Sequence, residues 1–318
     1  MKILVTGATG FVGSRVIKRL QSNKKNSLVA VVRKKNTKLN NDVGTIIISD
    51  LNEFVPWEKY LTDVDVIIHT AARVHVLNDT SKDPFNEFRK VNVEGTLALA
   101  REAAKSGVKR FIFLSSIKVN GEFTCVNEKF TASDTPKPKD FYGMSKLEAE
   151  IELFKLAENT ALEVVCIRPV LVYGAGVKAN FYNLMKLIDI GIPLPFGNVS
   201  NVRSFVSIEN LVDLIYTCIS HSQAINKVFL VSDDDDLSIT ELLTQLSRAF
   251  NKKSRFISVS PKILKLIFKI TGNSALSQKL LDNLQVDISA TKKTLNWSPP
   301  FSVFKGLQKT VAFYKDSK

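Results

Sequence analysis

Lys2-Ile3-Leu4-Val5-Thr6-Gly7-Ala8-Thr9-Gly10-Phe11-Val12-Gly13 is the stretch of this sequence that decides its fold. Its first five residues are apolar and branched, which is typical of a buried strand, and residues 15–20 then take up helical spacing. Between them, Gly7 permits a tight turn, Gly10 lets the backbone approach a phosphate, and Gly13 lets helix and strand pack closely. The helix N-terminus adds unpaired N–H groups and a partial positive charge. We therefore predict a turn that binds the diphosphate of a dinucleotide, rather than a purely structural turn.

Length and composition are ordinary for a globular protein. The 318 residues can bury a sizeable core, and 45% of them are hydrophobic and 24% charged. We expect no secretory leader, because Met1 leads directly into the first strand, and no spanning helix, because no apolar stretch approaches about 20 residues. Three widely spaced cysteines, Cys125, Cys166 and Cys218, show no metal or redox pattern, so we expect a cytoplasmic protein without a bound metal.

The net charge of +13 suggests an anionic partner. The lysines are scattered and lack the basic stripe interleaved with aromatic residues that marks a nucleic-acid site, so we expect no nucleic-acid partner. An acidic small-molecule substrate and an anionic membrane surface both fit the charge.

The second strand, residues 27–32, ends at Arg33-Lys34-Lys35. In a dinucleotide-binding fold this end faces the adenosine ribose, where an acidic residue suits the 2′-hydroxyl of NAD and an arginine suits the 2′-phosphate of NADP. Because Arg33 stands here without an acid, we predict NADP or NAD as cofactor, with NADP slightly preferred.

Strands and helices alternate through the first half of the chain. Further strands are expected at residues 45–48, 65–69 and 110–114, with helices over 53–61 and from Asp83-Pro84 through 91–96 to residue 105. This alternation indicates a parallel doubly wound sheet. We expect His69, at a strand end, to be a packed residue and not a catalyst.

Tyr142 and Lys146 are the candidates for chemistry. They are four residues apart, so on a helix they share a face, and an ammonium close to a phenol lowers its pKa. Hydride transfer at a carbinol carbon requires a proton to move on the oxygen, and such a tyrosine can move it. A serine hydroxyl can bind the same oxygen, and Ser116 precedes Tyr142 by 26 residues (142 − 116). The alternative is an ordinary amphipathic helix.

With these residues in place, the sequence resembles an extended short-chain dehydrogenase/reductase of the NAD-dependent epimerase/dehydratase family. The resemblance covers nearly the whole chain, and the GxxGxxG spacing is that group's own variant. The motifs that carry it are TGATGFVG, DVIIHTAA, VNVEGT, FLSS, YGMSK, IRPVLVYG, RSFVSIENLVDLI and WSPP. It implies an α/β fold, a Rossmann doubly wound parallel sheet with a smaller mixed C-terminal substrate domain.

The resemblance implies a role for each matching residue. Tyr142 would be the catalytic acid/base, Lys146 would tune it and bind the nicotinamide ribose, and Ser116 would hold the reacting oxygen. The other expected cofactor contacts are Gly7, Gly10, Phe11 and Val12 at the pyrophosphate, Asp50 and Leu51 at the adenine, Ala71, Ala72 and Asn92 in the middle of the site, and Pro169 and Val172 at the nicotinamide.

The resemblance also implies how the chain divides. We expect residues 1–173 and about 204–232 to form the dinucleotide-binding domain, and residues 174–203 and about 233–318 to form the substrate domain. In the latter, Asn180 and Arg203 would contact a substrate diphosphate, and Phe196 would lie near the base. The expected partners are a UDP-sugar and a second copy of the chain in a homodimer.

Three further segments carry predictions of their own. Ile117-Lys118 stands where dehydratases carry an acidic pair, which disfavours dehydration, and Lys118 either reaches the substrate or faces solvent. Residues 261–270 are apolar and basic, and form either a helix packed on the substrate domain or a contact with an anionic bilayer, peripheral to the inner membrane. Asp233–Asp236 is expected to be a solvated turn.

Three functions remain. The first is a reductase of a UDP-4-keto-6-deoxy-N-acetylhexosamine for surface polysaccharide, because SSIKVNGE and Arg33 are similar to that branch. The alternative is a 4-epimerase of UDP-glucose or UDP-N-acetylglucosamine, free or lipid-diphosphate-linked, and the two share one catalytic trio. A third, more remote function is an NADP-sensing regulator without chemistry. It is disfavoured because the chain keeps both Tyr142 and Lys146.

Overall fold

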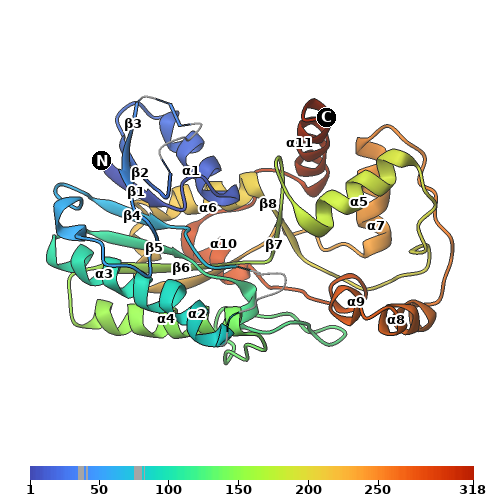
Figure 1. Ribbon diagram of the computed structural model, residues 1–318. Coiled ribbons are helices and arrows are strands. Elements are labelled where there is room, and N and C mark those ends of the chain that lie inside the picture. Colours follow the sequence, from blue (N-terminus) through green and yellow to red (C-terminus); the bar gives the residue numbers. More distant parts are fainter. Residues whose placement is uncertain (35–38, 41, 75–80, 82) are drawn as a thin grey trace.

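A seven-stranded parallel sheet is the centre of the computed structural model, which describes residues 1–34, 39, 40, 42–74, 81 and 83–318 (Figure 1). Its strand order is β3-β2-β1-β4-β5-β6-β9, and every neighbouring pair is parallel. The strands are β1 (Lys2–Thr6), β2 (Ser27–Val32), β3 (Val43–Ile47), β4 (Val66–His69), β5 (Arg110–Leu114), β6 (Glu163–Pro169) and β9 (Lys227–Val231). The predicted Rossmann doubly wound sheet is confirmed.

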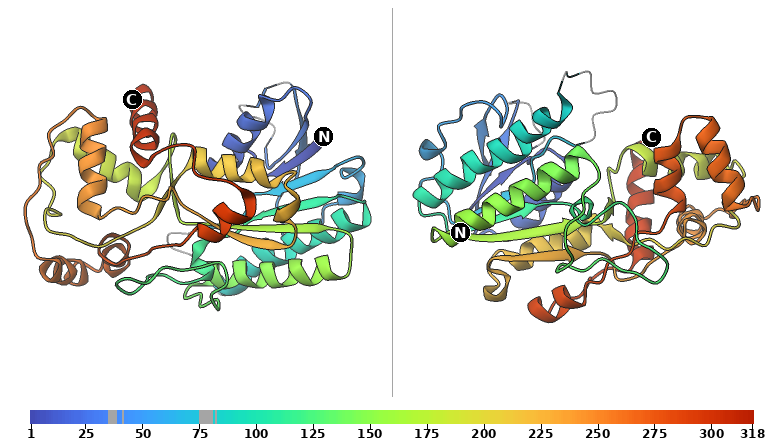
Figure 2. Two further views of the ribbon diagram at one scale, coloured as in Figure 1. Left: turned by 180° about the vertical axis from the view of Figure 1, so that it is seen from behind. Right: turned by 90° about the horizontal axis from the view of Figure 1, so that it is seen from below.

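Helices cover both faces of this sheet, because its strands are apolar on both sides. One face packs against α1 (Phe11–Gln21), α6 (Ile208–Cys218) and α10 (Ser289–Leu295). The other face packs against α3 (Thr96–Lys105) and α4 (Phe141–Glu158), with α2 (Pro84–Arg89) beside α4. Figure 2 shows the two helical layers from behind and from below.

A smaller lobe follows the sheet and has its own core. Its helices are α5 (Ala179–Ile190), α7 (Ile239–Ala249), α8 (Pro261–Ile270), α9 (Ser274–Leu281) and α11 (Val303–Asp316). The two-stranded sheet of β7 (Leu171–Tyr173) and β8 (Phe205–Ser207) joins it to the large sheet. Leu295 and Trp297 return to the core of the large sheet, and the predicted division into two domains stays a prediction.

Two local predictions were wrong. The helix expected over residues 53–61 is only a 3₁₀ turn, η1 (Trp57–Lys59), because Pro56 lacks an N–H and its ring disrupts a continuous helix. Asp233 is not in a solvated turn. It is buried and accepts hydrogen bonds from Tyr173 Oη at 2.6 Å and Asn210 Nδ2 at 2.6 Å, so it joins β7, α6 and the end of β9.

Candidate active site

The glycine turn lies at the carboxyl end of β1, where the strand order reverses between β1 and β4. In doubly wound sheets this switch point is where ligands bind. Gly7 has φ +65°, and a Cβ on it would lie 2.7 Å from the backbone nitrogen of Ala71. A Cβ on Gly13 would lie 2.2 Å from the Gly7 carbonyl oxygen. Only glycine fits these two positions, so the predicted turn has the shape that a dinucleotide diphosphate requires.

The start of α1 faces this turn. Gly10 is its N-cap and supplies no side-chain cap, and the first turn holds no acidic residue. The helix therefore presents backbone N–H groups and its positive dipole end near Phe11 and Val12, which are both half-buried. These residues fit an anionic group.

His69 is a structural residue at the end of β4. Its ring is fully buried, with Nδ1 2.9 Å from Thr6 Oγ1 and Nε2 3.0 Å from Thr96 Oγ1. Burial, with the charge of Lys146, lowers its pKa to about 3. It therefore stays neutral and holds β1, β4 and α3 together, as expected from the sequence.

The residues predicted for the adenosine end lie after β2 and β3. Arg33 is exposed directly after β2, and Lys35 lies outside the described residues. Asp50 is half-buried and accepts a hydrogen bond from the N–H of Leu51 at 2.6 Å. Leu51 is buried against Gly95, whose Cβ would lie 2.5 Å from the Leu51 carbonyl oxygen.

Asn92 braces the middle of the site. It lies in a π-helical turn, η2 (Lys90–Gly95), between α2 and α3, a local geometry that is frequent at functional sites. Its Oδ1 accepts from the N–H of Arg73 at 2.8 Å, and its Nδ2 donates to the Arg73 carbonyl at 3.0 Å and to Ser145 Oγ at 2.9 Å. Asn92 thereby fixes the half-buried segment of Ala71 and Ala72 against helix α4.

Ser116, Tyr142 and Lys146 come together at the carboxyl end of β5. Ser116 caps the short turn η3 (Ile117–Val119), and its hydroxyl hydrogen-bonds to the phenol of Tyr142. Tyr142 and Lys146 lie one helical turn apart in the first half of α4. Lys146 is 1% exposed, donates to the Leu114 carbonyl at 2.9 Å, and has its Nζ 6.0 Å from the centre of the Tyr142 ring.

The electrostatics of this trio differ from the sequence-based prediction. Burial and the nearby Asp140 carboxylate raise the pKa of Tyr142, and the Ser116 hydrogen bond opposes them. Burial lowers the pKa of Lys146 to about 7, against the charge of Glu150. In the protein without cofactor, Lys146 therefore does not lower the pKa of the Tyr142 phenol as expected. The reason is that Lys146 is only partly charged at neutral pH and donates its hydrogen bond to a backbone carbonyl.

Asp140, which the sequence analysis missed, ties the trio to Lys118. It caps α4 by accepting from the N–H of Gly143 at 2.7 Å. Its other oxygen forms an ion pair with Lys118, whose ammonium also contacts Glu122 at 3.0 Å. Burial lowers the pKa of Lys118, but the hydrogen bonds and charges of Asp140 and Glu122 outweigh it and raise that pKa. Lys118 is thus partly buried and paired, not solvent-facing. An aspartate before an apolar helix start is the pattern that could have found Asp140.

A buried ion pair supports α4 from the other side. The guanidinium of Arg168 donates to Glu150 at 3.0 Å and 2.5 Å, and to Asn120 Oδ1 at 2.9 Å. Pro169 follows in the sheet and is buried, while Val172, in β7, is half-buried. This pair links β6, α4 and the segment after Ser116, so it holds the trio's elements in one arrangement.

The structure describes only some of the side chains predicted to contact the substrate diphosphate and base. Arg203 is bridged to Leu237 and Leu284 and donates to the Asp282 carbonyl at 2.7 Å, and burial lowers its pKa to about 10. Asn180 lies in α5, but its side chain is outside the described part of the structure. The side chain of Phe196 is buried in the small-lobe core, and its place near the base stays a prediction.

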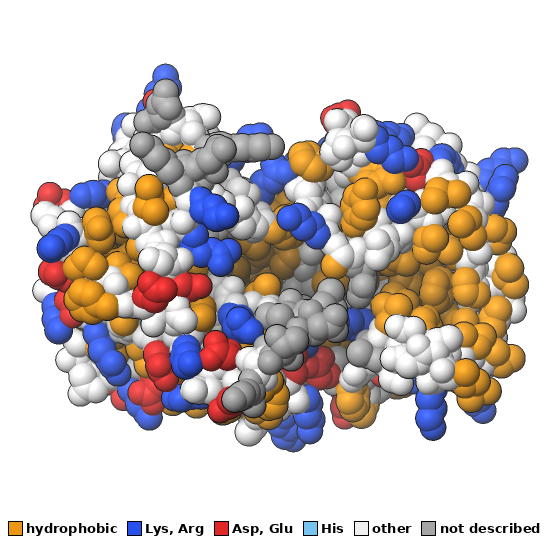
Figure 3. Space-filling model, in the orientation of Figure 1, with side chains coloured by type: hydrophobic (Ala, Val, Ile, Leu, Met, Phe, Trp, Pro, Cys, Tyr) orange, Lys and Arg blue, Asp and Glu red, His pale blue; other side chains and the backbone are white. Residues whose placement is uncertain are grey.

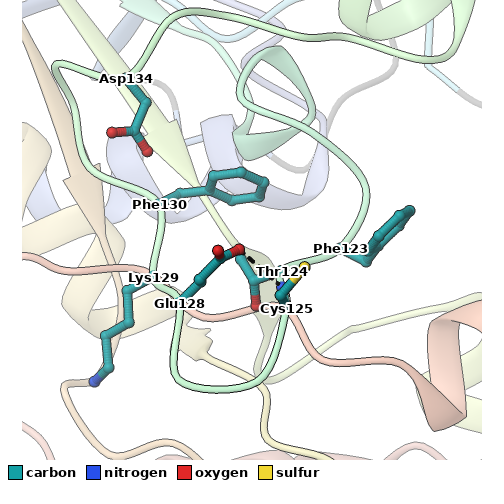
Figure 4. Close-up of a pocket in the computed structure, with 7 residues that line it drawn as sticks. All are labelled: Phe123, Thr124, Cys125, Glu128, Lys129, Phe130 and Asp134. Atoms are coloured by element: carbon teal, nitrogen blue, oxygen red, sulfur yellow. Dashed lines mark hydrogen bonds between the residues drawn. The ribbon is translucent and has the colours of Figure 1, made fainter.

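The loop between Ser116 and Tyr142 encloses a separate hollow (Figure 4). Its volume is about 320 Å³, and none of the predicted site residues lines it. The lining residues are Phe123, Thr124, Cys125, Glu128, Lys129, Phe130 and Asp134. Glu128 raises the pKa of the Cys125 thiol, which disfavours a reactive thiolate. The loop is held to the Arg203 segment because Phe130 donates its N–H to Gln285 at 2.9 Å and Ser204 donates its N–H to Leu284 at 2.8 Å.

Comparison with known proteins agrees with this geometry. The model of the NAD dependent epimerase/dehydratase family matches residues 3–232. A UDP-glucose 4-epimerase of Vibrio cholerae is 47% identical over 97% of this chain and 94% of its own length. An N-acetyl-alpha-D-glucosaminyl-diphospho-ditrans,octacis-undecaprenol 4-epimerase of Escherichia coli O157:H7 is 26% identical over 98% of this chain and 94% of its own. The structure of UDP-glucuronic acid 4-epimerase from Bacillus cereus in complex with NAD shares the fold, with a TM-score of 0.80 and 23% identity over 99% of this chain and 97% of that one.

Proposed function

Because the chain belongs to the NAD-dependent epimerase/dehydratase family, we propose that it is a UDP-sugar 4-epimerase, with UDP-glucose as the first candidate substrate. The observation that carries this proposal is the 47% identity, along almost the full length of both chains, to the V. cholerae enzyme of that name. The sequence alone put a 4-keto reductase first and the epimerase second. The comparisons favour the epimerase alternative over the reductase.

In the proposed reaction, a bound NAD would supply reversible hydride chemistry at the 4-carbon of the sugar, and the glycine turn with the start of α1 would hold it there. Tyr142 takes the proton from the 4-hydroxyl and gives it back, because its phenol is the acid/base of the trio. Ser116 holds the same oxygen and, through its hydrogen bond, favours the phenolate of Tyr142. Lys146 would add positive charge at the buried end of the site in the fraction of molecules in which it is protonated, because its pKa is about 7.

The cofactor and the substrate would be bound by residues of different elements. The glycine turn and the start of α1 would hold the cofactor diphosphate, and Arg33 would meet its adenosine ribose. Arg203 would pair with the diphosphate of the substrate, since a guanidinium suits a phosphate oxygen pair. The slight preference for NADP predicted from Arg33 remains a prediction, and the family points to NAD.

A lipid-diphosphate-linked N-acetylhexosamine is the second candidate substrate. Its support is the E. coli relative, which by its name acts on an undecaprenol diphosphate sugar, and the apolar, basic surface of α8. Both candidates present a diphosphate to Arg203, so the catalytic trio does not separate them.

One experiment tests the proposal. Purified protein is incubated with UDP-glucose without added cofactor, and the product is analysed for UDP-galactose. The protein is then denatured, and the released dinucleotide is identified. An epimerase converts the sugar with the dinucleotide that it retains. Turnover only with added NADPH, on a 4-keto sugar, would overturn the proposal in favour of a reductase.

A further inference from the structure

Helix α8 carries an apolar stripe that faces away from the protein. Ile263, Leu266, Ile267 and Ile270 are 53%, 57%, 49% and 76% exposed. Their spacing of three, four and seven residues places them on one side of the helix. We call this set the exposed α8 stripe. Leu264, which is 3% exposed, and Phe268 lie on another side and hold the helix to the small-lobe core.

The exposed α8 stripe is part of a larger apolar surface. Figure 3 shows hydrophobic side chains gathered over the end of the molecule formed by α5, α7 and α8, with Lys and Arg side chains at its rim. Ile190, Ile192 and Ile257 are exposed at the same end, where Ile257 donates its N–H to Leu194 at 2.9 Å. Contiguous exposed apolar surface rimmed by polar residues marks an interaction site.

The chain segment that carries α8 has charges of one sign, and Asp189 and Asp282 from outside it pair with two of its lysines, Lys252 and Lys265. Residues 251–281 contain seven Lys and Arg and no Asp or Glu, which is more than half of the net charge of +13. Lys262, Lys265 and Lys269 form a stripe on α8 beside the exposed one. Lys265 pairs with Asp282, whereas Lys262 and Lys269 make no ion pair with another described residue. The partner must therefore offer apolar and anionic groups together.

We propose that the exposed α8 stripe docks this protein onto an anionic lipid bilayer. A helix with an apolar side and lysines beside it lies in the plane of the interface, with its apolar side among the acyl chains and the ammonium groups at the lipid phosphates. A second copy of this chain is the weaker candidate, because a two-fold contact through α8 would bring Lys262 and Lys269 close to the same lysines of the other copy. In the described part of the chain no helix has the length and apolarity to cross a membrane.

Helix α8 and Arg203, the arginine proposed to bind the substrate, share one hydrogen-bond partner, Asp282. The carbonyl of Asp282 accepts from Arg203 at 2.7 Å, and its carboxylate accepts from Lys265 at 2.7 Å. Docking through α8 therefore orients the Arg203 side of the protein toward the lipid headgroups. The docking itself rests on surface shape and charge, and not on the proposed epimerase function.

Sedimentation with vesicles tests the proposal on the full chain. The vesicles are phosphatidylcholine alone, or an equal mixture of phosphatidylcholine and phosphatidylglycerol. We expect at least about tenfold stronger binding to the mixture, released by salt. Leu266→Ser with Ile270→Ser should weaken it at least about tenfold, because the apolar area is lost. Lys262→Glu with Lys269→Glu should weaken it at least about thirtyfold.

The matched control is Phe54→Ser with Ile151→Ser, which removes exposed apolar side chains from the sheet domain and should leave binding unchanged. Circular dichroism and thermal unfolding of every variant check that the fold is intact. Vesicle binding is measured without an activity assay, so its outcome does not depend on the proposed epimerase function. Equal binding to both vesicles, no binding, or unchanged binding of the α8 variants overturns the proposal. So does a dimer in solution that Leu266→Ser with Ile270→Ser dissociates, since the stripe would then bind a second copy.

Discussion

Lys118 and Asp140 form an ion pair that joins the turn after Ser116 to the first turn of the helix carrying Tyr142. The Asp140 carboxylate raises the pKa of Tyr142, and the Lys118 ammonium offsets that charge. We predict that Lys118→Met moves the acid limb of the kcat/KM profile about one pH unit higher, because an unbalanced carboxylate disfavours the phenolate.

Asp140→Asn provides the opposite change. Asparagine still caps the helix, but the charge is gone, so the acid limb should move to lower pH, and the double variant should return near wild type. Lys139→Met, an exposed neighbour, is the control. If Lys118 acts instead as a substrate contact, its variant raises KM and leaves the limb in place.

Tyr142→Phe tests the acid/base directly. The variant keeps the ring in place and removes only the hydroxyl, so we expect kcat to fall by about 10²–10⁴. The dinucleotide recovered after denaturation should match wild type in amount. Tyr182→Phe, at an exposed tyrosine of α5, should retain full activity. Wild-type turnover in Tyr142→Phe would remove the phenol from the mechanism.

The sequence predicted the elements that depend on local pattern. The strand of residues 2–6, the glycine turn and the helix of Tyr142 and Lys146 are each specified within a few neighbouring residues, and the family resemblance is confirmed. What it missed depends on burial. The pKa of Tyr142 is set by desolvation and by Asp140 from the helix cap, and neither effect is visible in a four-residue spacing.

Long-range partners were equally hidden. Asp233 looked like part of a solvated acidic run, yet Tyr173 and Asn210 bury it, from positions 60 and 23 residues away. Pro56 lies within residues 53–61, where a helix was expected, and its effect on the helix is a local one that the sequence does contain. Composition alone did not show that α8 leaves an apolar stripe uncovered either, since the same spacing fits a core helix.

Arg33→Asp tests cofactor choice. Arg33 is exposed at the end of β2, where an aspartate would accept from a ribose 2′-hydroxyl and repel a 2′-phosphate. The ratio of NADP to NAD affinity should fall by at least about tenfold, measured by titration of protein stripped of dinucleotide. Lys34→Asp next to it should change the ratio less. An unaltered ratio in Arg33→Asp would place the ribose elsewhere.

Glu150→Gln tests the buried support of α4. The change leaves the Arg168 guanidinium buried with its charge unpaired, so the free energy of unfolding should fall by about 3–5 kcal/mol in urea titrations. Glu152→Gln breaks the exposed pair with Lys155 on the same helix and should cost under about 1 kcal/mol. Equal losses in the two variants would mean that the buried pair adds nothing specific.

Lys146 gives the stability of the cofactor-free protein a defined pH dependence. Its pKa falls from 10.5 in the unfolded chain to about 7 in the folded one. Below pH about 7 both states carry the charge, and the cost of burying it is fully present. Between about 7 and 10.5 only the unfolded chain binds the proton, so stability rises with pH, by at most about 5 kcal/mol.

Lys146→Met removes this dependence because methionine does not titrate. Urea unfolding from pH about 6 to about 10 should show wild type gaining stability relative to the variant as pH rises. The reason is that unfolding of wild type takes up a proton on Lys146 in this range, whereas the variant has no such group. Lys155→Met, at an exposed position of the same helix, should run parallel to wild type. If wild type and Lys146→Met also ran parallel, Lys146 would keep an ordinary pKa in the folded chain. Its ammonium would then be fully charged at neutral pH, and the trio would be tuned as the sequence alone suggested.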